Sequence, residues 1–379
     1  MAGDELGEAV RNGDDRLVIE VLVGHAGGAP ESSGTRHVSS AGRFVGAIIG
    51  HGLDSRVELA LARMRKFLID TDTASDDAVA MCMALRHNEI DVVAFTVVAG
   101  NVPLDQAVQN ALYTVELCGE ETPVYVGADR PILRDLGTAQ DVHGQDGMGD
   151  IGLPLSGRTP ADGWAPQVII DTIRNNPDQI TLVAIGPLTN VAIALLMAPD
   201  IAEKVERVVI MGGTGEYGPG NISPTAEFNF WVDPEAVRVV LRSGMPLELV
   251  GWDMSIKNAV VTNERQAELR SIGELGAFAV NIQATLASYA WDQTRLDGPD
   301  FPDPIAMAHA IDPSPATLEH LGVDVAVGVE PMRGTMIVDH FGFAKLPQNA
   351  KIVTDYPADR FFGLLYELLS DRSDDEDET

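Results

Sequence analysis

Four aspartates lie within one eight-residue segment of this 379-residue chain: Asp70, Asp72, Asp76 and Asp77. They follow an apolar run and precede a segment with helical periodicity. Helix capping explains one or two of these acids, because carboxylates in a first helical turn interact favourably with the helix dipole. Four carboxylates this close repel one another unless a cation neutralises them, and carboxylate oxygens suit Ca²⁺ or Mg²⁺. The segment therefore predicts a divalent-metal site.

Three later segments place polar side chains or glycines directly after an apolar run: Gly100-Asn101, Ile185-Gly-Pro-Leu-Thr-Asn190 and Met211-Gly-Gly. Two more segments combine polar side chains without such a run before them: the stretch from Gly220-Asn221 through Glu227-Phe-Asn229, and Phe301-Pro302-Asp303. Asn190 opens a helical pattern, so its amide is expected to cap that helix.

The apolar runs are short, and helical periodicity separates them from residue 66 onward. We expect strands at 66–70, 92–98, 123–126, 180–185, 207–211, 247–250, 323–329 and 350–354. We expect helices at 76–87, 103–118, 164–175, 188–197, 234–243, 263–271, 274–296, 304–311 and 357–369. This alternation predicts an α/β fold, a single-domain, open, mostly parallel twisted sheet with helices on both faces. Such sheets bind ligands beyond the carboxyl ends of their strands, where the polar segments fall.

The chain is strongly acidic, with 57 Asp and Glu against 26 Lys and Arg and a formal net charge of −31. This charge argues against nucleic-acid and anionic-membrane partners, because both would repel the protein. Many acids with few lysines are also typical of halophilic proteins, which are solvated in concentrated salt. The sequence has no apolar run long enough to span a bilayer. We expect a cytoplasmic protein whose two cysteines, Cys82 and Cys118, are free thiols.

Residues 1–65 differ in composition from the rest of the chain, with 11 of the 37 glycines and no lysine. Three interpretations stay open: a disordered extension, a small appended element, or an upstream stretch translated from a misplaced start codon. We expect one catalytic domain at 66–370 and a solvated acidic tail at 371–379.

The aspartate segment resembles the signature of the inosine-uridine-preferring nucleoside hydrolase family, Asp-x-Asp-Pro-Gly-x-Asp-Asp. It departs from that signature at Thr73 and Ala74, which stand where the family has Pro-Gly, but it keeps every carboxylate. The later segments are similar to the family's Gly-Asn, Gly-Leu-Thr-Asn, Met-Gly-Gly, Ala-Glu-Phe-Asn and Asp-Pro-x-Ala motifs, in the same order. The resemblance covers residues 64–367 and implies a Rossmann-like nucleoside hydrolase fold. It also implies Ca²⁺-dependent hydrolysis of the N-glycosidic bond of ribonucleosides, which yields ribose and a free nucleobase.

The resemblance implies a Ca²⁺ site made of three aspartates, Asp72, Asp77 and Asp303, and the backbone carbonyl of Ile185. An all-oxygen set of this kind suits Ca²⁺. Asp72 would also be the general base that takes a proton from a metal-bound water.

The same resemblance assigns six residues to the substrate: Asp76, Asn101, Met211, Asn221, Glu227 and Asn229. Asp76 and Asn229 would bind ribose hydroxyls, with Asn101 beside them. Asn221 and Glu227 would hold the 5′-hydroxyl, and Met211 would lie against the sugar. The family also suggests a homodimer or homotetramer with a small nucleoside as its partner.

The group that protonates the leaving nucleobase is where this sequence departs most from the family. Many members have a histidine directly before the late metal aspartate, where this chain has Pro302. His143 lies in a glycine-rich loop similar to one that borders the family's base pocket, and it is the remaining candidate for the catalytic acid. Aromatic stacking is another way to bind the base, and four side chains are candidates for it: Trp231, Trp252, Trp291 and Phe301.

Two other function classes stay open. A phosphate-ester hydrolase would use the same acidic site, although phosphatases that open with Asp-x-Asp have Thr or Val where this chain has Ala74. A nucleoside-binding protein without turnover would agree with the proline at Pro302. The preference for purine or pyrimidine bases is left open as well.

Overall fold

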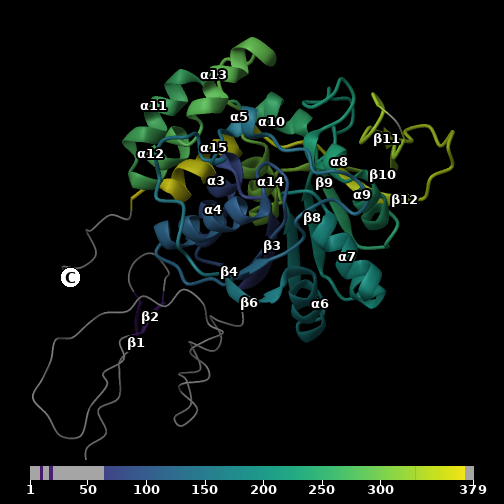
Figure 1. Cartoon of the computed structure of the whole chain (residues 1–379), viewed down its shortest axis with the longest axis horizontal. Helices are drawn as coiled ribbons and strands as arrows, with labels where there is room; N and C mark the ends of the chain where they lie inside the picture. The colour runs from purple at the N-terminus through teal and green to yellow at the C-terminus, as the bar shows by residue number, and fades with distance from the viewer. Residues whose placement is uncertain (1–8, 12–16, 20–63, 329, 372–379) are drawn as a thin grey trace, which may run out of the picture. The chain divides into compact units, whose positions relative to one another are not determined.

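The computed structural model describes residues 9–11, 17–19, 64–328 and 330–371 (Figure 1). Arg65–Asp371 form one compact unit. In the other unit, β1 (Ala9–Arg11) pairs in antiparallel fashion with β2 (Leu17–Ile19). Most of the predicted extension 1–65 and nearly all of the predicted tail 371–379 lie outside the described residues, so both stay predictions.

A ten-stranded sheet forms the centre of the large unit, in the order β11-β10-β12-β9-β8-β7-β3-β4-β5-β6. Its strands are β3 (Arg65–Thr71), β4 (Ile90–Val97), β5 (Val124–Val126), β6 (Ala161–Trp164), β7 (Ile180–Ala184), β8 (Arg207–Met211), β9 (Leu247–Val250), β10 (Thr317–Val325), β11 (Met336–Val338) and β12 (Gln348–Asp355). Neighbouring strands from β12 to β6 are parallel, and β10 pairs in antiparallel fashion with β12 and β11. The open, mostly parallel sheet confirms the predicted fold class.

Helices follow most of the strands and lie on both faces of the sheet (Figure 1). They are α3 (Ser75–Arg86), α4 (Leu104–Leu117), α5 (Gln140–His143), α6 (Ala165–Asn175), α7 (Thr189–Met197), the 3₁₀ helix η1 (Pro199–Glu203), α8 (Phe228–Val232), α9 (Pro234–Leu241), α10 (Trp252–Asn258), α11 (Asn263–Ser271), α12 (Glu274–Asn281), α13 (Ala284–Gln293), α14 (Pro302–Ile311) and α15 (Ala358–Leu369). Among the described helices, none combines the length and the apolarity that a membrane span needs.

Two predicted elements were wrong in extent. The predicted helix 274–296 is two helices, α12 and α13, with the buried residues Ile282 and Gln283 between them. The predicted strand 323–329 overlaps β10 only at its last three residues and runs past its end, because the first residues of β10 are mostly exposed and have no apolar pattern. The pattern also misses β6, β11, α5, α8 and α10, because elements this short show too few repeats of either period.

Alternate residues of β3 pack on opposite faces of the sheet. Phe67 and Ile69 belong to the core under α3, α4, α14 and α15, whereas Leu68 belongs to the core under α6, α7 and α9. A strand that is buried on both faces must be apolar at every position. The continuous apolar run before the aspartates is the result.

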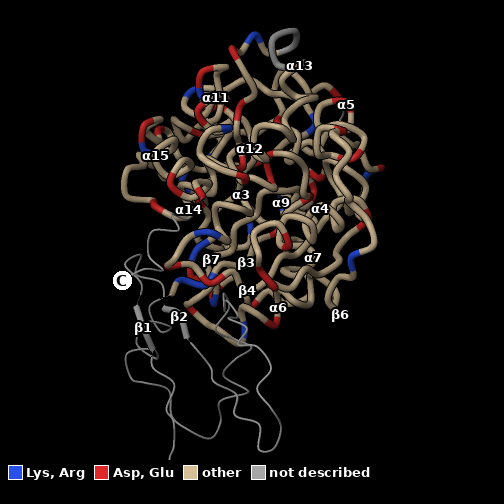
Figure 2. The backbone as a smooth tube through the Cα atoms, turned by 90° about the vertical axis from the view of Figure 1, so that its left-hand side faces the viewer, with Lys and Arg blue, Asp and Glu red and all other residues tan. Residues whose placement is uncertain are grey.

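Both ends of the sheet hold charged side chains, but among the described strands only the end opposite the aspartates of β3 has bases at its strand starts. The strand order reverses between β3 and β7, and the carboxyl ends of such a pair are where open α/β sheets bind ligands. Asp70 and Asp72 lie at that end of β3. Basic residues lie at the opposite end, where Arg65, Lys66 and Arg207 begin β3 and β8, and Figure 2 shows blue positions gathered near β3 and β7.

Candidate active site

Asp72 directly follows β3 and is completely buried. Its Oδ2 accepts a hydrogen bond of 2.6 Å from the backbone N–H of Asn101, and its Oδ1 has no partner among the described residues. Two glycines lie against this side chain. A Cβ at Gly100 would lie 2.1 Å from Oδ2, and a Cβ at Gly186 would lie 2.8 Å from Oδ1. The carboxylate is therefore held in one position, with one oxygen available to a ligand.

Asp76 and Asp77 lie in the first turn of α3. Three donors fix Asp77. Its Oδ1 accepts from the hydroxyl of Thr71 at 2.6 Å, and its Oδ2 accepts from the backbone N–H of Ala74 at 2.9 Å and from the amide of Asn101 at 3.3 Å. Oδ1 of Asp76 has no hydrogen-bond partner among the described residues. The turn between β3 and α3 thus brings both carboxylates to the end of the sheet.

Asp303 reaches the same place from a distant part of the chain, in the first turn of α14. Oxygens of Asp76, Asp77 and Asp303 lie within 4.8 Å of one another, and all three residues are buried. Burial, and then the charges of Asp76, Asp77 and Asp72, raise the pKa of Asp303 well above its usual value. Two of these residues, Asp77 and Asp303, belong to the predicted ligand set. The third predicted carboxylate ligand, Asp72, lies close enough for its charge to raise the pKa of Asp303.

The four carboxyl groups resist ionisation together. Burial raises the pKa of Asp72 well above its usual value, and the charge of Asp77 adds to this effect. Burial also raises the pKa of Asp76 and that of Asp77 to about 6. Across the described ranges, no lysine or arginine forms an ion pair with any of the four. The free oxygens of Asp72 and Asp76 and the all-oxygen donor set fit a hard divalent cation, which would supply the missing positive charge.

Ile185, Met211 and Asn229 meet beside this cluster. The backbone N–H of Ile185 donates to the carbonyl of Asp70 at 2.8 Å, which joins the end of β7 to β3. The amide nitrogen of Asn229 donates to the carbonyl of Ile185 at 3.0 Å and to that of Met211 at 3.3 Å. A carbonyl oxygen has two lone pairs, so Ile185 keeps one for a cation. Because the nitrogen of Asn229 is committed, its Oδ1 is the atom that can accept a bond from a substrate hydroxyl.

Glu227 is buried, and it caps α8, a role that the sequence did not suggest. Its Oε1 accepts from the backbone N–H of Asn229 at 2.7 Å, and its Oε2 accepts from those of Gly213 at 2.9 Å and Phe230 at 3.2 Å. Burial raises the pKa of Glu227 to about 7 despite these bonds. Asn221 is exposed in the preceding loop, so the structure leaves it apart from the buried residues of the site.

His143 ends the short helix α5 and contacts α3. Its Nδ1 lies 2.8 Å from the hydroxyl of Ser75 and 3.7 Å from Oδ1 of Asp76. The Ser75 hydroxyl lies 2.9 Å from Oε1 of Gln283. Burial lowers the pKa of His143, and the charge of Asp77 opposes this shift. The structure therefore brings this histidine to the acidic cluster, together with Ser75 and Gln283, which no sequence motif marked.

Two of the four candidates for stacking on the base are core residues. Phe301 is 0 % exposed and Trp252 is buried, and both belong to the hydrophobic core under α3 and α14, so their stacking on a base stays a prediction. Trp231 instead packs against Arg333, whose Cζ lies 4.0 Å from the ring centroid. The side chain of Trp291 lies outside the described residues.

Asn190 does not cap α7, so that prediction was wrong. Leu188 is the N-cap of this helix. The amide of Asn190 instead joins three segments: its nitrogen donates to Asp70 at 2.9 Å and to the carbonyl of Val97 at 3.1 Å, and its oxygen accepts from the N–H of Ala128 at 2.9 Å. Burial raises the pKa of Asp70 to about 7 despite its hydrogen bonds. Asp70, one of the four clustered acids in the sequence, therefore belongs to a structural network.

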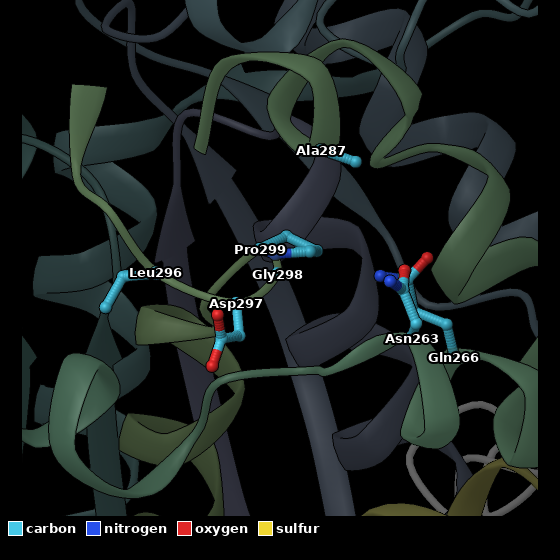
Figure 3. Close-up of a pocket in the computed structure, with 7 residues that line it drawn as sticks. All are labelled: Asn263, Gln266, Ala287, Leu296, Asp297, Gly298 and Pro299. Carbon is cyan, nitrogen blue, oxygen red and sulfur yellow. The ribbon is translucent and has the colours of Figure 1, made fainter. Parts of the chain in front are cut away.

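A separate pocket of about 300 Å³ opens between α11, α13 and the segment that leads to α14 (Figure 3). It is lined by Asn263, Gln266, Ala287, Leu296, Asp297, Gly298 and Pro299. Every predicted site residue lies outside this set, so the pocket is not where the predicted chemistry takes place.

Residues 67–363 match the model of a family described as inosine-uridine preferring nucleoside hydrolase. The pyrimidine-specific ribonucleoside hydrolase RihB of Escherichia coli is 35% identical over 306 residues, which are 80% of this chain and 97% of RihB. A solved plant nucleoside hydrolase, the PpNRh1 enzyme, superposes with a TM-score of 0.76 and 32% identity over 81% of this chain and 99% of its own. A purine-preferring ribonucleoside hydrolase from Gardnerella vaginalis superposes with a TM-score of 0.75 and 29% identity over 80% of this chain and 98% of its own. The chain therefore belongs to the inosine-uridine preferring nucleoside hydrolase family and is a nucleoside hydrolase.

Proposed function

We propose that this enzyme hydrolyses the N-glycosidic bond of ribonucleosides in a Ca²⁺-dependent reaction, with Asp72 as the general base. The observation that carries the proposal is the buried cluster of Asp72, Asp76, Asp77 and Asp303, which has no lysine or arginine partner in the described part of the chain. Buried acids that raise one another's pKa are typical of sites that bind cations or transfer protons. A phosphate-ester hydrolase has less support, because a phosphate would add negative charge to this cluster.

Four oxygen donors would hold the ion: the carboxylates of Asp72, Asp77 and Asp303 and the carbonyl of Ile185. Asp77 is already oriented by its three hydrogen bonds, and the carbonyl of Ile185 retains a lone pair. When bound, Ca²⁺ would lower the pKa of a coordinated water and bind the ribose 2′- and 3′-hydroxyls.

Asp72 would accept the proton of the attacking water at Oδ1, because Asn101 already occupies Oδ2. As the water oxygen bonds to C1′, the bond from C1′ to the base nitrogen breaks, and its electron pair leaves with the nucleobase. The sugar passes through an oxocarbenium-like transition state, as in glycoside hydrolysis in general. His143 would protonate the departing base, since it lies at the rim of the same cluster.

The substrate residues would hold the sugar at its hydroxyls. Asp76 and Oδ1 of Asn229 would accept bonds from the ribose, with Asn101 beside them and Met211 against the ring. Glu227 and Asn221 would hold the 5′-hydroxyl. Because Asn221 is exposed, its contact requires the loop before α8 to fold over the bound sugar.

The base preference is left to experiment, because one relative is named pyrimidine-specific and another purine-preferring. The homodimer or homotetramer, the cytoplasmic location and the lack of nucleic-acid and membrane partners also stay predictions.

The release of free ribose from uridine, cytidine, inosine and adenosine, with Ca²⁺ and with a chelator, tests the proposal. Asp72→Asn keeps the shape of the side chain but removes the general base that accepts the proton of water, so kcat should fall by about 10²-fold or more. Asp171→Asn, at an exposed position on α6, is the matched control. Activity that survives both the chelator and Asp72→Asn would refute the mechanism. Binding of a riboside without release of ribose would instead support a protein without turnover.

A further inference from the structure

We infer that Ser75 and Gln283 form a hydrogen-bond chain that holds a proton on Nδ1 of His143, so that the ring gives its proton to the leaving nucleobase at Nε2. The inference rests on the proposed role of His143 as the leaving-group acid. It assigns a positioning role to two residues that the family motifs do not specify, because Ser75 stands at a variable position of the aspartate signature and Gln283 lies outside the motifs.

The direction of the chain follows from counting protons. The hydroxyl of Ser75 has a single hydrogen and lies 2.9 Å from Oε1 of Gln283, an acceptor that has no hydrogen of its own. That hydrogen is therefore used on Gln283. The oxygen of Ser75, 2.8 Å from Nδ1 of His143, must then accept a hydrogen from the ring. Nδ1 carries a proton in the neutral ring as well as in the charged one.

The consequence for the reaction is that only Nε2 changes its protonation. The charged ring transfers the Nε2 proton to the base as the base departs with the electron pair of the broken bond. The ring that remains is neutral and protonated on Nδ1, which is the form that Ser75 already binds. The hydrogen bonds need no rearrangement during the transfer, which is the advantage of a preorganised site.

The chain is rigid because each member is fixed by a different element. Ser75 is the first residue of α3 and is 0 % exposed, and Gln283 lies between α12 and α13 and is 1 % exposed. His143 ends α5. At such burial Ser75 and Gln283 cannot exchange these partners for water, whereas the side chain of His143 is 12 % exposed.

The amide of Gln283 decides which nitrogen of the ring is protonated. If the amide were reversed, its nitrogen would donate to Ser75, and Ser75 would donate to Nδ1 of His143. The neutral ring would then carry its proton on Nε2, and the product of the transfer would not match the chain. Gln283 is therefore as important to the inference as Ser75, and replacing either one should have the same effect.

The test compares two substrates that differ in their need for an acid. Uridine and inosine have poor leaving groups, uracil and hypoxanthine, which need a proton as they depart, whereas 4-nitrophenyl β-D-ribofuranoside releases a phenolate that needs no proton. Ser75→Ala and Gln283→Leu should each lower kcat for the nucleosides about tenfold, with little change in KM and with kcat for the nitrophenyl riboside within about twofold of wild type. Ser288→Ala, at an exposed serine on α13, is the matched control. An equal loss on both substrates would reduce the role of Ser75 and Gln283 to folding and overturn the inference.

Two further measurements separate this inference from the proposed function. In a His143→Ala background, Ser75→Ala should cause no additional loss on nucleosides, because both variants remove one proton transfer. Additive losses would contradict the chain. The ¹⁵N shifts of the His143 ring report its tautomer without any turnover: we expect the Nδ1–H form in wild type and its loss in Gln283→Leu. If His143→Ala cleaves nucleosides at the wild-type rate, the catalytic role of His143 fails, whereas an Nε2–H tautomer in wild type refutes the hydrogen-bond chain itself.

Discussion

Gly100 lies so close to the carboxylate of Asp72 that there is no room for even one methyl group. A Cβ at this position would lie 2.1 Å from Oδ2 of Asp72 and 2.9 Å from Cδ of Pro187, whereas ordinary contact begins at 3.4 Å. Gly100→Ala would therefore push the Asp72 carboxylate aside by about 1 Å, a displacement large enough to affect catalysis.

The direction of this displacement is unfavourable because Asp72 is 0 % exposed and Gly186 approaches its other oxygen. The carboxylate can move only by losing its 2.6 Å hydrogen bond from Asn101. A misplacement of about 1 Å at a catalytic group costs about 10²-fold in rate, so we expect kcat to fall by about that factor. Overpacking at a buried site should also lower the free energy of unfolding by about 1–3 kcal/mol.

Gly363→Ala is the matched control, since Gly363 lies inside α15 and a Cβ there would meet no atom within 4 Å. Alanine in a helix interior should raise the free energy of unfolding by about 1 kcal/mol and leave kcat unchanged. Ribose release at saturating uridine or inosine, together with urea denaturation, measures both quantities for both variants. If Gly100→Ala keeps kcat within about twofold of wild type, Asp72 is not the positioned base that we propose.

Three other perturbations test the electrostatics and the core of the site. Burial raises the pKa of Asp76 and that of Asp77 to about 6, so with a chelator present the free energy of unfolding should fall as the pH rises from about 4 to about 6. Saturating Ca²⁺ should abolish this fall. An identical pH profile with and without Ca²⁺ would exclude the metal site. Burial raises the pKa of Glu248, but the hydrogen bond from His309 and the other basic neighbours outweigh burial and lower this pKa to about 2. Wild type should therefore be more stable than Glu248→Gln by about 1–2 kcal/mol above pH 4.5, after allowance for solvent screening. In urea denaturation this advantage should shrink as the pH falls toward 2. Asn190→Ala removes three hydrogen bonds, two of them fully buried, and should cost about 3–5 kcal/mol of unfolding free energy. A loss below about 1 kcal/mol would contradict the structural network.

Much of the large unit was predictable because its central strands are buried on both faces. A strand such as β3 must then be apolar throughout, and that constraint is visible in a single sequence. The half-exposed β10 and the one-turn helices α5 and α8 have no such constraint, so their limits come from tertiary contacts. The type and order of the sheet were therefore easier to predict than its edges.

The acidic residues of the site were predictable for a different reason: clustered carboxylates repel one another and need a cation or another partner to neutralise them. The sequence cannot say which carboxylates face one another, and Asp70 shows the limit, since it binds Asn190 in a structural network. It also cannot mark neutral residues that act through hydrogen bonds. Ser75 and Gln283 are 208 positions apart and meet only because α3 packs against the α12–α13 junction.

The departure from the family signature at Thr73 and Ala74 leaves the turn between β3 and α3 intact for two local reasons. Thr73 adds a backbone N–H that a proline would lack, and the hydroxyl of Thr71 accepts it at 3.1 Å. Ala74 has a φ of −116°, which any residue can adopt, so this turn does not need the conformational freedom of a glycine. The hydroxyl of Thr71 also donates to Asp77 at 2.6 Å, and the N–H of Ala74 donates to the same carboxylate at 2.9 Å. Thr71 and the backbone of Ala74 thus orient one of the proposed metal ligands directly, and Thr73 holds the Thr71 hydroxyl. Thr71→Val should therefore weaken Ca²⁺ binding in a titration, whereas an unchanged affinity would show that the turn holds Asp77 without Thr71.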